Sequence, residues 1–217
     1  MNVITDSDLI RLFESWKTLF AEQREFLIAL DGKVGDSDLG ITMSKAFAAA
    51  ADALIAEGEG AGISKLLRTA GATMARAAPS TMGTLTATGF LRASKATEGK
   101  VTLTTADVAA FWRAYRDGVA ERGKAKLGDK TVLDVLDPIA ATLEAQALSG
   151  ATLSDALAAT TGAAKEALEA TKSMSAQHGK AAAFRDKTIG LQDAGATVGY
   201  LLIERMWEFV AETEPRS

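Results

Sequence analysis

Three aspartates lie within one short, glycine-rich stretch of the sequence. Residues 30–40 read LDGKVGDSDLG, so Asp31, Asp36 and Asp38 stand close together, with Lys33 as the nearest cation. The glycines indicate a turn rather than a helix. Carboxylates this close repel one another unless they are solvated, partly protonated or bound to a cation. Mg²⁺ prefers oxygen ligands and commonly binds carboxylates together with phosphate oxygens. The spacing therefore favours a metal site and an ordinary acidic surface loop about equally.

Asp38 has a further explanation, because an apolar helix is predicted to begin at this residue or just after it. A side-chain oxygen at a helix N-cap accepts hydrogen bonds from the first free N–H groups. This role would explain Asp38 but neither of the other two aspartates. The spacing also differs from that of an EF-hand loop, which needs acids at alternate positions and a closing glutamate.

A second stretch has a pattern that suits phosphate. Residues 77–90 read AAPSTMGTLTATGF, which predicts a helix end, a turn at the proline and a new helix that begins with Ser80, Thr81, Met82 and Gly83. The first N–H groups of a helix have no partner inside the helix, and the positive end of the helix dipole attracts anions. A plain serine or threonine N-cap is the commoner explanation for any single occurrence of this pattern.

A third stretch brings polar residues to another predicted helix start. Residues 126–138 read KLGDKTVLDVLDP and include Asp129 and Lys130. Gly123 and Gly128 give this region the glycine spacing of a phosphate-binding P-loop. However, Asp129 occupies the position of the P-loop lysine and no strand precedes it, so we reject a P-loop.

A fourth stretch forms a loop-rich connection before the last predicted helix. Residues 178–197 read HGKAAAFRDKTIGLQDAGAT and contribute Lys180, Arg185 and Asp193. His178 is the one histidine of the chain. A lone histidine in a loop is more often solvated or paired with a helix end than a carrier of phosphate, and we expect the same here.

Apolar residues recur with a period of 3.6 along most of the chain, which is typical of amphipathic helices. The first stripe predicts one long helix from Asp6 to Leu30. Further stripes, separated by glycine, proline and serine, predict helices at about 39–57, 62–78, 81–97, 105–123, 131–148, 152–176 and 193–212. One run, residues 100–105, has a strand-like pattern but is too short to build a sheet. Alanine-rich helices joined by short loops predict an all-α fold of about eight antiparallel helices in a bundle or helical barrel.

The composition favours one globular domain spanning residues 1–217, with 47% hydrophobic residues. A net charge of −4 gives no electrostatic reason to expect nucleic acid or a membrane surface as a partner. The absence of cysteine excludes disulfides, thiolate metal sites and a cysteine nucleophile. The first residues lack the pattern of a secretion signal, and we expect no segment to reach the length of a membrane span. These features together predict a cytoplasmic protein.

Taken in order, the four stretches resemble the nucleotide-binding L subunit (DhaL type) of dihydroxyacetone kinases. The GDxDxG loop of that family is similar to DGKVGDSDLG, and its GDKTMLDAL.P segment is similar to GDKTVLDVLDP. Its late GRA and G.QDPGA motifs are similar to GKA and GLQDAGA. The resemblance covers nearly the whole chain and implies a barrel of eight antiparallel helices with the nucleotide at one end.

The resemblance also implies which residues act. The metal ligands would be Asp31, Asp36 and Asp38, which in the family hold two Mg²⁺ ions on the nucleotide phosphates. The same three aspartates and Lys180 would be the catalytic residues. The residues that would bind ADP or ATP are Ser80, Thr81, Met82, Gly83, Asp129, Lys180 and Asp193.

The activity implied is phosphoryl transfer to dihydroxyacetone or a related small ketose. In the family a separate K subunit holds the ketose, so this chain would be inactive by itself. The phosphoryl donor would be ATP, or bound ADP that a phosphocarrier protein rephosphorylates. The mechanism would need little covalent chemistry from this chain, because cations and helix-start amides orient the phosphates.

Departures from the family pattern motivate a second hypothesis. Leu39 replaces a histidine that usually follows the third aspartate, and Met82 lies where relatives have a glycine- and serine-rich phosphate loop. Lys180 replaces an arginine, which keeps the charge but loses a planar fork for phosphate. Ala194 replaces a proline. The alternative is therefore a regulatory or sensor protein that binds ADP and Mg²⁺ without turnover.

Overall fold

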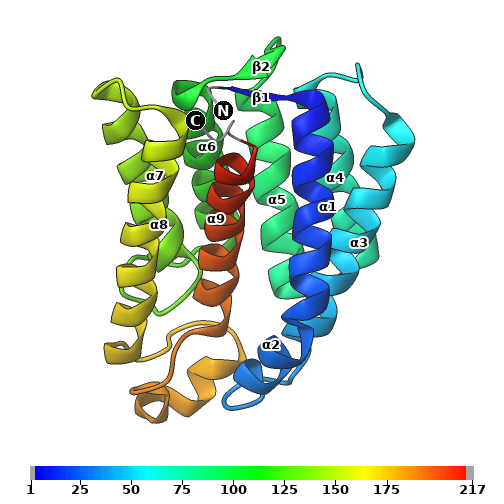
Figure 1. Cartoon of the computed structure of the whole chain (residues 1–217). Coiled ribbons are helices and arrows are strands. Elements are labelled where there is room, and N and C mark those ends of the chain that lie inside the picture. The colour runs from blue at the N-terminus through cyan, green and yellow to red at the C-terminus, as the bar shows by residue number, and fades with distance from the viewer. Residues whose placement is uncertain (1–2, 214–217) are drawn as a thin grey trace.

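The computed structural model describes residues 3–213 and is built almost entirely of α-helices (Figure 1). The helices are α1 (Asp6–Glu22), α2 (Arg24–Asp31), α3 (Leu39–Glu57), α4 (Ile63–Ala77), α5 (Thr81–Ala96), α6 (Thr105–Gly123), α7 (Leu133–Leu148), α8 (Leu153–Ala170) and α9 (Ala194–Glu212). Short 3₁₀ helices lie at Thr171–Ser173 and Lys180–Thr188. Two strands, β1 (Ile4–Thr5) and β2 (Thr102–Leu103), form one antiparallel pair.

The long helices close into a ring. In order around it, α1, α3, α4, α5, α6, α7, α8 and α9 each pack against the next, and α9 packs against α1. Successive helices run in opposite directions, so their connections alternate between two ends of the barrel (Figure 1). One end carries β1, β2 and both ends of the described chain, and the other carries α2 and the 3₁₀ helix Lys180–Thr188. The predicted all-α antiparallel barrel is confirmed.

The long helix predicted from Asp6 to Leu30 is instead two helices that meet at Gln23. Leu27 and Leu30 remain buried after the break, so the apolar period continues and hides it in the sequence. At this point α3 comes very close to α2. A Cβ on Gly40 would lie 2.1 Å from the carbonyl oxygen of Arg24, so only glycine fits there.

The helix predicted to end near residue 176 also stops early, at Ala170. The Thr171 hydroxyl donates to the Leu168 carbonyl at 2.7 Å and accepts the Asp193 N–H at 3.1 Å. Such side-chain bonds compete with continued helix, and the chain turns away into a long connection. The strand-like run at residues 100–105 contributes only the two residues of β2.

Aromatic rings fill the centre of the barrel. Phe90 lies at the middle, with its ring centroid 5.1 Å from that of Phe13, 5.9 Å from Trp16 and 5.2 Å from Tyr115. Phe90 and Tyr115 meet edge to face, which complements the ring quadrupoles. The Trp16 indole N–H donates to the Leu202 carbonyl at 3.1 Å, so the polar edge of this buried ring is satisfied. This core joins both halves of the ring of helices.

The expectation that no segment reaches the length of a membrane span was wrong. By length and composition alone α3 is apolar enough to cross a membrane. Half of its apolar window is buried inside the barrel, where Phe47 and Leu54 are fully covered. That burial is typical of a core helix in a folded domain.

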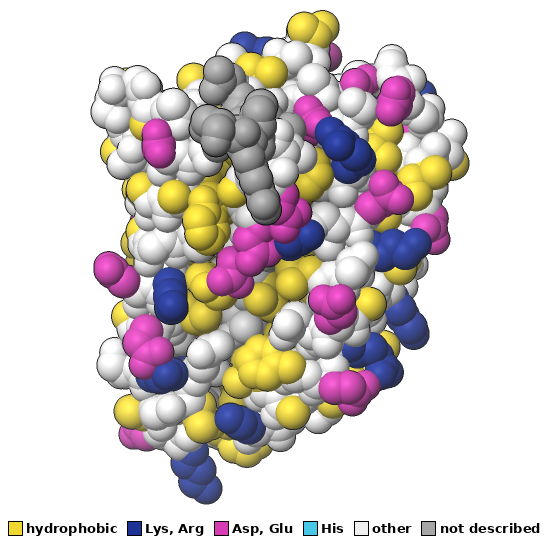
Figure 2. Space-filling model, in the orientation of Figure 1, with side chains coloured by type: hydrophobic (Ala, Val, Ile, Leu, Met, Phe, Trp, Pro, Cys, Tyr) yellow, Lys and Arg dark blue, Asp and Glu magenta, His cyan; other side chains and the backbone are white. Residues whose placement is uncertain are grey.

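The face seen in Figure 2 has acidic and basic side chains interspersed over its described residues. Acidic side chains gather in one run at its centre, and no large basic patch is present on this face among those residues. It therefore lacks the basic stripe that is the electrostatic footprint of a nucleic-acid binder.

Replacing the central ring should destabilise the whole barrel. For Phe90→Ala we expect the free energy of unfolding to fall by about 3 to 5 kcal/mol, because the change leaves a cavity among four helices. Urea denaturation followed by circular dichroism measures this. Val101→Ala is the control, since that side chain is 83% exposed and its loss should change the free energy by less than about 0.5 kcal/mol. Equal effects of the two changes would contradict the assignment of the core.

Candidate functional site

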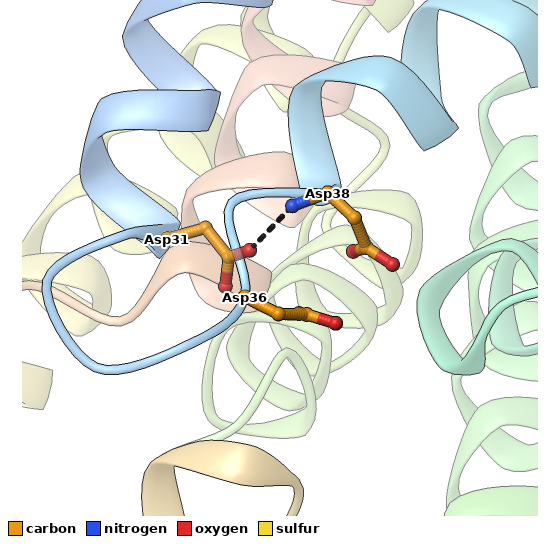
Figure 3. A group of neighbouring side chains, drawn as sticks. All are labelled: Asp31, Asp36 and Asp38. Carbon is orange, nitrogen blue, oxygen red and sulfur yellow. Dashed lines mark hydrogen bonds between the residues drawn. The ribbon is translucent and has the colours of Figure 1, made fainter.

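The three aspartates converge at the end of the barrel that carries α2. Asp31 ends α2, Asp38 immediately precedes α3, and Asp36 lies in the turn between them (Figure 3). One carboxylate oxygen from each lies within 4.8 Å of the others. Asp31 Oδ2 accepts the Asp38 N–H at 3.0 Å, and Ser37 has a left-handed φ of 61°. The loop thus gathers three oxygen ligands of the kind that a hard divalent cation prefers.

The capping explanation for Asp38 fails. Asp38 occupies the N-cap position of α3, but its side chain makes no capping hydrogen bond. Its partial burial and the neighbouring Asp31 carboxylate raise the pKa of Asp38. The carboxylate is therefore directed into an acidic cluster whose repulsion a bound cation would relieve.

Gly35 makes room for the Asp31 carboxylate. The Gly35 N–H donates to the Asp31 carbonyl at 2.6 Å, which draws the loop tightly over the end of α2. A Cβ on Gly35 would lie 2.2 Å from Asp31 Oδ1. Glycine is thus required by the close approach of the backbone to a candidate metal ligand.

The start of α5 forms another wall of the site. The Ser80 hydroxyl accepts the Gly83 N–H at 3.1 Å, so the ordinary N-cap interpretation of this serine is correct. The N–H groups of Thr81 and Met82 have no partner among the described residues and remain available to an anion. A Cβ on Gly83 would lie 2.0 Å from the Ala78 carbonyl oxygen, so this glycine serves close packing of the turn.

Asp129 forms hydrogen bonds with its own loop and with the segment that contains His178. Its carboxylate accepts the Lys126 N–H at 2.7 Å and the His178 Nε2–H at 2.9 Å. Its carbonyl accepts the Gln177 N–H at 3.0 Å. The bond from the Lys126 amide, and then the His178 ring, lower the pKa of Asp129. His178 thus has a carboxylate partner on a loop, where we expected solvent or a helix end.

Asp193 caps the last helix. Its Oδ1 accepts the Ala196 N–H at 2.6 Å at the start of α9. Burial raises the pKa of Asp193 to about 6, against the opposing effects of the Ala196 N–H and the Lys130 ammonium. This carboxyl group therefore titrates near neutrality rather than near pH 4.

Lys180 supplies a cation that the local sequence does not reveal. Its ammonium pairs with the Asp36 carboxylate, although the two residues are 144 positions apart. Lys33 is the nearest cation in the sequence, whereas only the family resemblance implied that Lys180 acts together with the three aspartates. The fold instead brings Lys180 from the connection between α8 and α9, and leaves its side chain 66% exposed.

These elements enclose one cavity of about 920 Å³. The predicted site residues that line it are Asp31, Asp36, Asp38, Ser80, Thr81, Met82, Lys180 and Asp193. Gly83 and Asp129 are outside the lining. The volume suits a drug-sized or nucleotide-sized ligand. A smaller hollow of about 480 Å³ between α2, α8 and α9 contains none of the predicted site residues.

The polar cavity residues to which sequence reasoning assigned no role include Arg122, Lys130 and Gln192. Lys130 stands within the GDKT motif, which did mark its neighbourhood. Arg122 lies in the last turn of α6 and carries no sequence signal that separates it from other surface arginines. Gln192 stands beside Asp193 in the late motif.

Comparisons with known proteins show the family of this chain. A family model described as the DAK2 domain matches residues 33–208. The chain belongs to the DAK2 domain family. It is 34% identical over 179 residues to the PEP-dependent dihydroxyacetone kinase, ADP-binding subunit DhaL, of Escherichia coli K12, covering 82% of this chain and 85% of that one. The resemblance to L subunits is thereby confirmed.

Longer relatives contain a similar region as one part. The D-erythrulose kinase of Mycolicibacterium smegmatis is 33% identical over 189 residues, which are 86% of this chain and 32% of that protein. The native dihydroxyacetone kinase of C. freundii superposes with a TM-score of 0.72 at 24% identity, over 92% of this chain and 34% of that one. At this identity the likeness to the C. freundii structure shows the shared helical fold alone.

Adding one methyl group beside Asp31 should disturb the acidic loop. For Gly35→Ala we expect the affinity for Mn²⁺ to fall at least about tenfold, because the new Cβ displaces the Asp31 carboxylate. Isothermal titration with MnCl₂ measures this. Gly162→Ala in α8 is the matched control, since nothing lies within 4 Å of its Cβ and its Mn²⁺ affinity should not change. Equal Mn²⁺ affinities for Gly35→Ala and the parent chain would contradict the proposed role of Asp31.

Asp193 should give a distinctive pH dependence of stability. Its pKa is about 6 in the folded chain, against a usual 3.8. Between about pH 4 and 6 the folded state keeps a proton that the unfolded state releases, so its contribution falls as pH rises, by about 2 to 3 kcal/mol in all. The free energy of unfolding relative to Asp193→Asn, measured by urea denaturation, should decline across this window. A difference that stays constant from pH 4 to 7 would refute the raised pKa.

Proposed function

We propose that this chain is the nucleotide- and Mg²⁺-binding subunit of a kinase that phosphorylates dihydroxyacetone or a related small ketose. One observation carries the proposal most directly. The three clustered carboxylates and the unpartnered amides at the start of α5 face the same cavity. Carboxylates with a cation, and helix-start amides, are two complementary means of binding phosphate groups.

The names of the relatives support the same assignment. The Escherichia coli relative is named an ADP-binding subunit, and the Mycolicibacterium smegmatis relative is named a D-erythrulose kinase. Both names describe phosphoryl transfer on small ketoses. The choice between dihydroxyacetone and a four-carbon ketose as substrate rests on the partner that holds the sugar.

The chain's own residues would bind and orient the nucleotide. Thr81 and Met82 would donate their amides to phosphate oxygens, with the dipole of α5 behind them. The Ser80 hydroxyl is already bonded to Gly83 and so keeps the turn in shape. Lys180 would contribute positive charge at the phosphate being transferred once its ammonium leaves Asp36.

The aspartates fit a cation. Asp31, Asp36 and Asp38 would hold two Mg²⁺ ions, as the family resemblance implies. The cations supply charge neutralisation and orientation of the phosphates, so the protein needs no covalent intermediate. Burial and, after it, the Asp31 carboxylate raise the pKa of Asp38, and a bound cation would offset the repulsion between the two carboxylates.

Residues 1–217 would act as one nucleotide-binding domain in the cytoplasm, completed by a ketose-binding K subunit. Asp36 of the acidic loop, His178 and Lys180 are exposed. The end of the barrel that carries α2 would meet the K subunit. A phosphocarrier protein would recharge bound ADP if ATP is not the donor.

Calorimetric titration tests the binding half of the proposal. We expect ADP to bind the nucleotide-free chain tightly with MgCl₂ present and weakly without it. Asp38→Asn should reduce the Mg²⁺-dependent affinity at least about tenfold, because it removes one anionic ligand. Asp52→Asn is the control, since Asp52 pairs with Lys17 on the barrel wall and should have no effect. Equal ADP affinities for Asp38→Asn and the parent chain would contradict the site.

Turnover separates the kinase from the regulatory alternative. Leu39 favours the alternative, because it is only 5% exposed and packs in the core, so it offers nothing to a phosphate. With ATP and a ketose-binding K subunit present, the kinase should phosphorylate dihydroxyacetone or erythrulose. Tight binding of ADP without transfer to either ketose would favour a sensor.

A further inference from the structure

The connection between α8 and α9 lies against the cavity and carries His178 and Lys180. We call residues 174–191 the strap. It has little apolar packing to hold it, since Phe184 and Ile189 are 42% and 52% exposed. Half of it, Lys180–Thr188, consists of short 3₁₀ turns that meet at Arg185, where φ is 45°. A segment of this kind needs specific anchors to keep one conformation.

Lys130 provides such an anchor from the opposite side. Its side chain is buried, with the residue only 3% exposed. The ammonium donates to the carbonyls of Met174 at 3.1 Å, Thr188 at 2.6 Å and Leu191 at 2.7 Å. An ammonium has three N–H donors, and here each has a carbonyl acceptor.

The three carbonyls come from the two ends of the strap. Met174 lies at its beginning, and Thr188 and Leu191 lie near its end. One ammonium therefore ties together two points that are far apart along the chain, and fixes the loop between them. Without that ammonium the three buried carbonyls would have to find other partners or water.

The residue before Lys130 strengthens the attachment. Asp129 accepts the Gln177 N–H on its carbonyl and the His178 ring on its carboxylate. Lys130 itself has a left-handed φ of 60°, a conformation that is uncommon for lysine. The side chains of Asp129 and Lys130 bond different residues of the strap, His178 and Thr188. Burial lowers the pKa of Lys130, and the nearby Asp193 carboxylate opposes that shift by stabilising the ammonium.

We propose that Lys130 is a positioning residue for nucleotide binding, whose ammonium holds both ends of the strap so that Lys180 stands over the acidic loop. The effect on nucleotide binding rests on the proposed function, in which Lys180 contributes positive charge to the phosphates. It assigns Lys130 no contact with the nucleotide. All three N–H donors of its ammonium bond carbonyl oxygens of the strap.

Hydrogen–deuterium exchange of the intact chain tests the anchor. For Lys130→Met, which keeps the length of the side chain, we expect amide exchange to rise at least about tenfold within residues 174–191. The Ala176 N–H, which bonds the Thr188 hydroxyl at 2.9 Å, and the Gly190 N–H, which bonds the Lys172 carbonyl at 2.7 Å, should report it. Exchange in α4 and α5 should not change.

Binding measurements separate positioning from general stability. In Lys130→Met the affinity for ADP with MgCl₂ should fall at least about tenfold, because Lys180 is no longer held over the acidic loop. The affinity for Mn²⁺ alone should not fall, because Lys130 bonds the strap rather than the aspartates and release of Lys180 removes a cation that pairs with Asp36. Lys172→Met is the matched control. That lysine lies just before the strap, but its ammonium pairs only with Glu169. It should change neither exchange nor affinity.

A second variant loosens the strap by another route. Thr188→Val removes the hydroxyl that donates to the Arg185 carbonyl at 2.6 Å and accepts the Ala176 N–H. It should reproduce the local exchange and the weaker ADP binding. If Thr188→Val does so and Lys130→Met does not, Lys130 is not the anchor.

Each remaining outcome is also decisive. Unchanged exchange in the strap of Lys130→Met would overturn the proposal, and so would faster exchange through the whole barrel or failure of that variant to fold. If the parent chain does not bind ADP, the proposed function fails, while the exchange experiment still decides whether Lys130 holds the strap.

Discussion

Repulsion among three carboxylates is the interaction on which the functional end of this barrel depends. Asp31 is fixed at the end of α2 and Asp38 at the start of α3, so the two cannot separate without moving a helix. The loop between them needs glycine at Gly35, because the backbone lies directly on the Asp31 carboxylate. Lys180 neutralises only Asp36, so the repulsion between Asp31 and Asp38 remains, as is typical of a site that binds a cation.

The rest of the chain is arranged around that site from both sides of the ring. The aromatic core fixes the helices, and the alternating direction of the helices brings the starts of α5, α7 and α9 to the same end as the acidic loop. Helix starts present free amides and positive dipole ends. The strap adds the positive charge of Lys180. Lys130, shortly before α7, bonds the strap and so holds it in place. Anion-binding and cation-binding groups thus face each other across one cavity.

Local patterns made much of this predictable. Glycines between apolar stretches of helical period predicted an antiparallel helical barrel. They also predicted that Asp31, Ser80 and Asp193 lie near helix ends. The break at Gln23 was hidden because Leu27 and Leu30 keep the apolar period through it. The pairing of Lys180 with Asp36 and the burial of Lys130 depend on how distant segments meet, and no spacing rule reports that. Its motif and the family resemblance predict Asp129 as a nucleotide contact, and the structure shows its carboxylate bonded to His178 of the strap.

A crystal structure of the chain grown with ADP and MnCl₂ tests the central claim most directly, because the anomalous signal of manganese locates the cation without assumption. The account predicts anomalous peaks bound by oxygens of Asp31, Asp36 and Asp38, with the nucleotide phosphates between them and the amides of Thr81 and Met82. Manganese bound elsewhere, or phosphates that do not approach the start of α5, would contradict it.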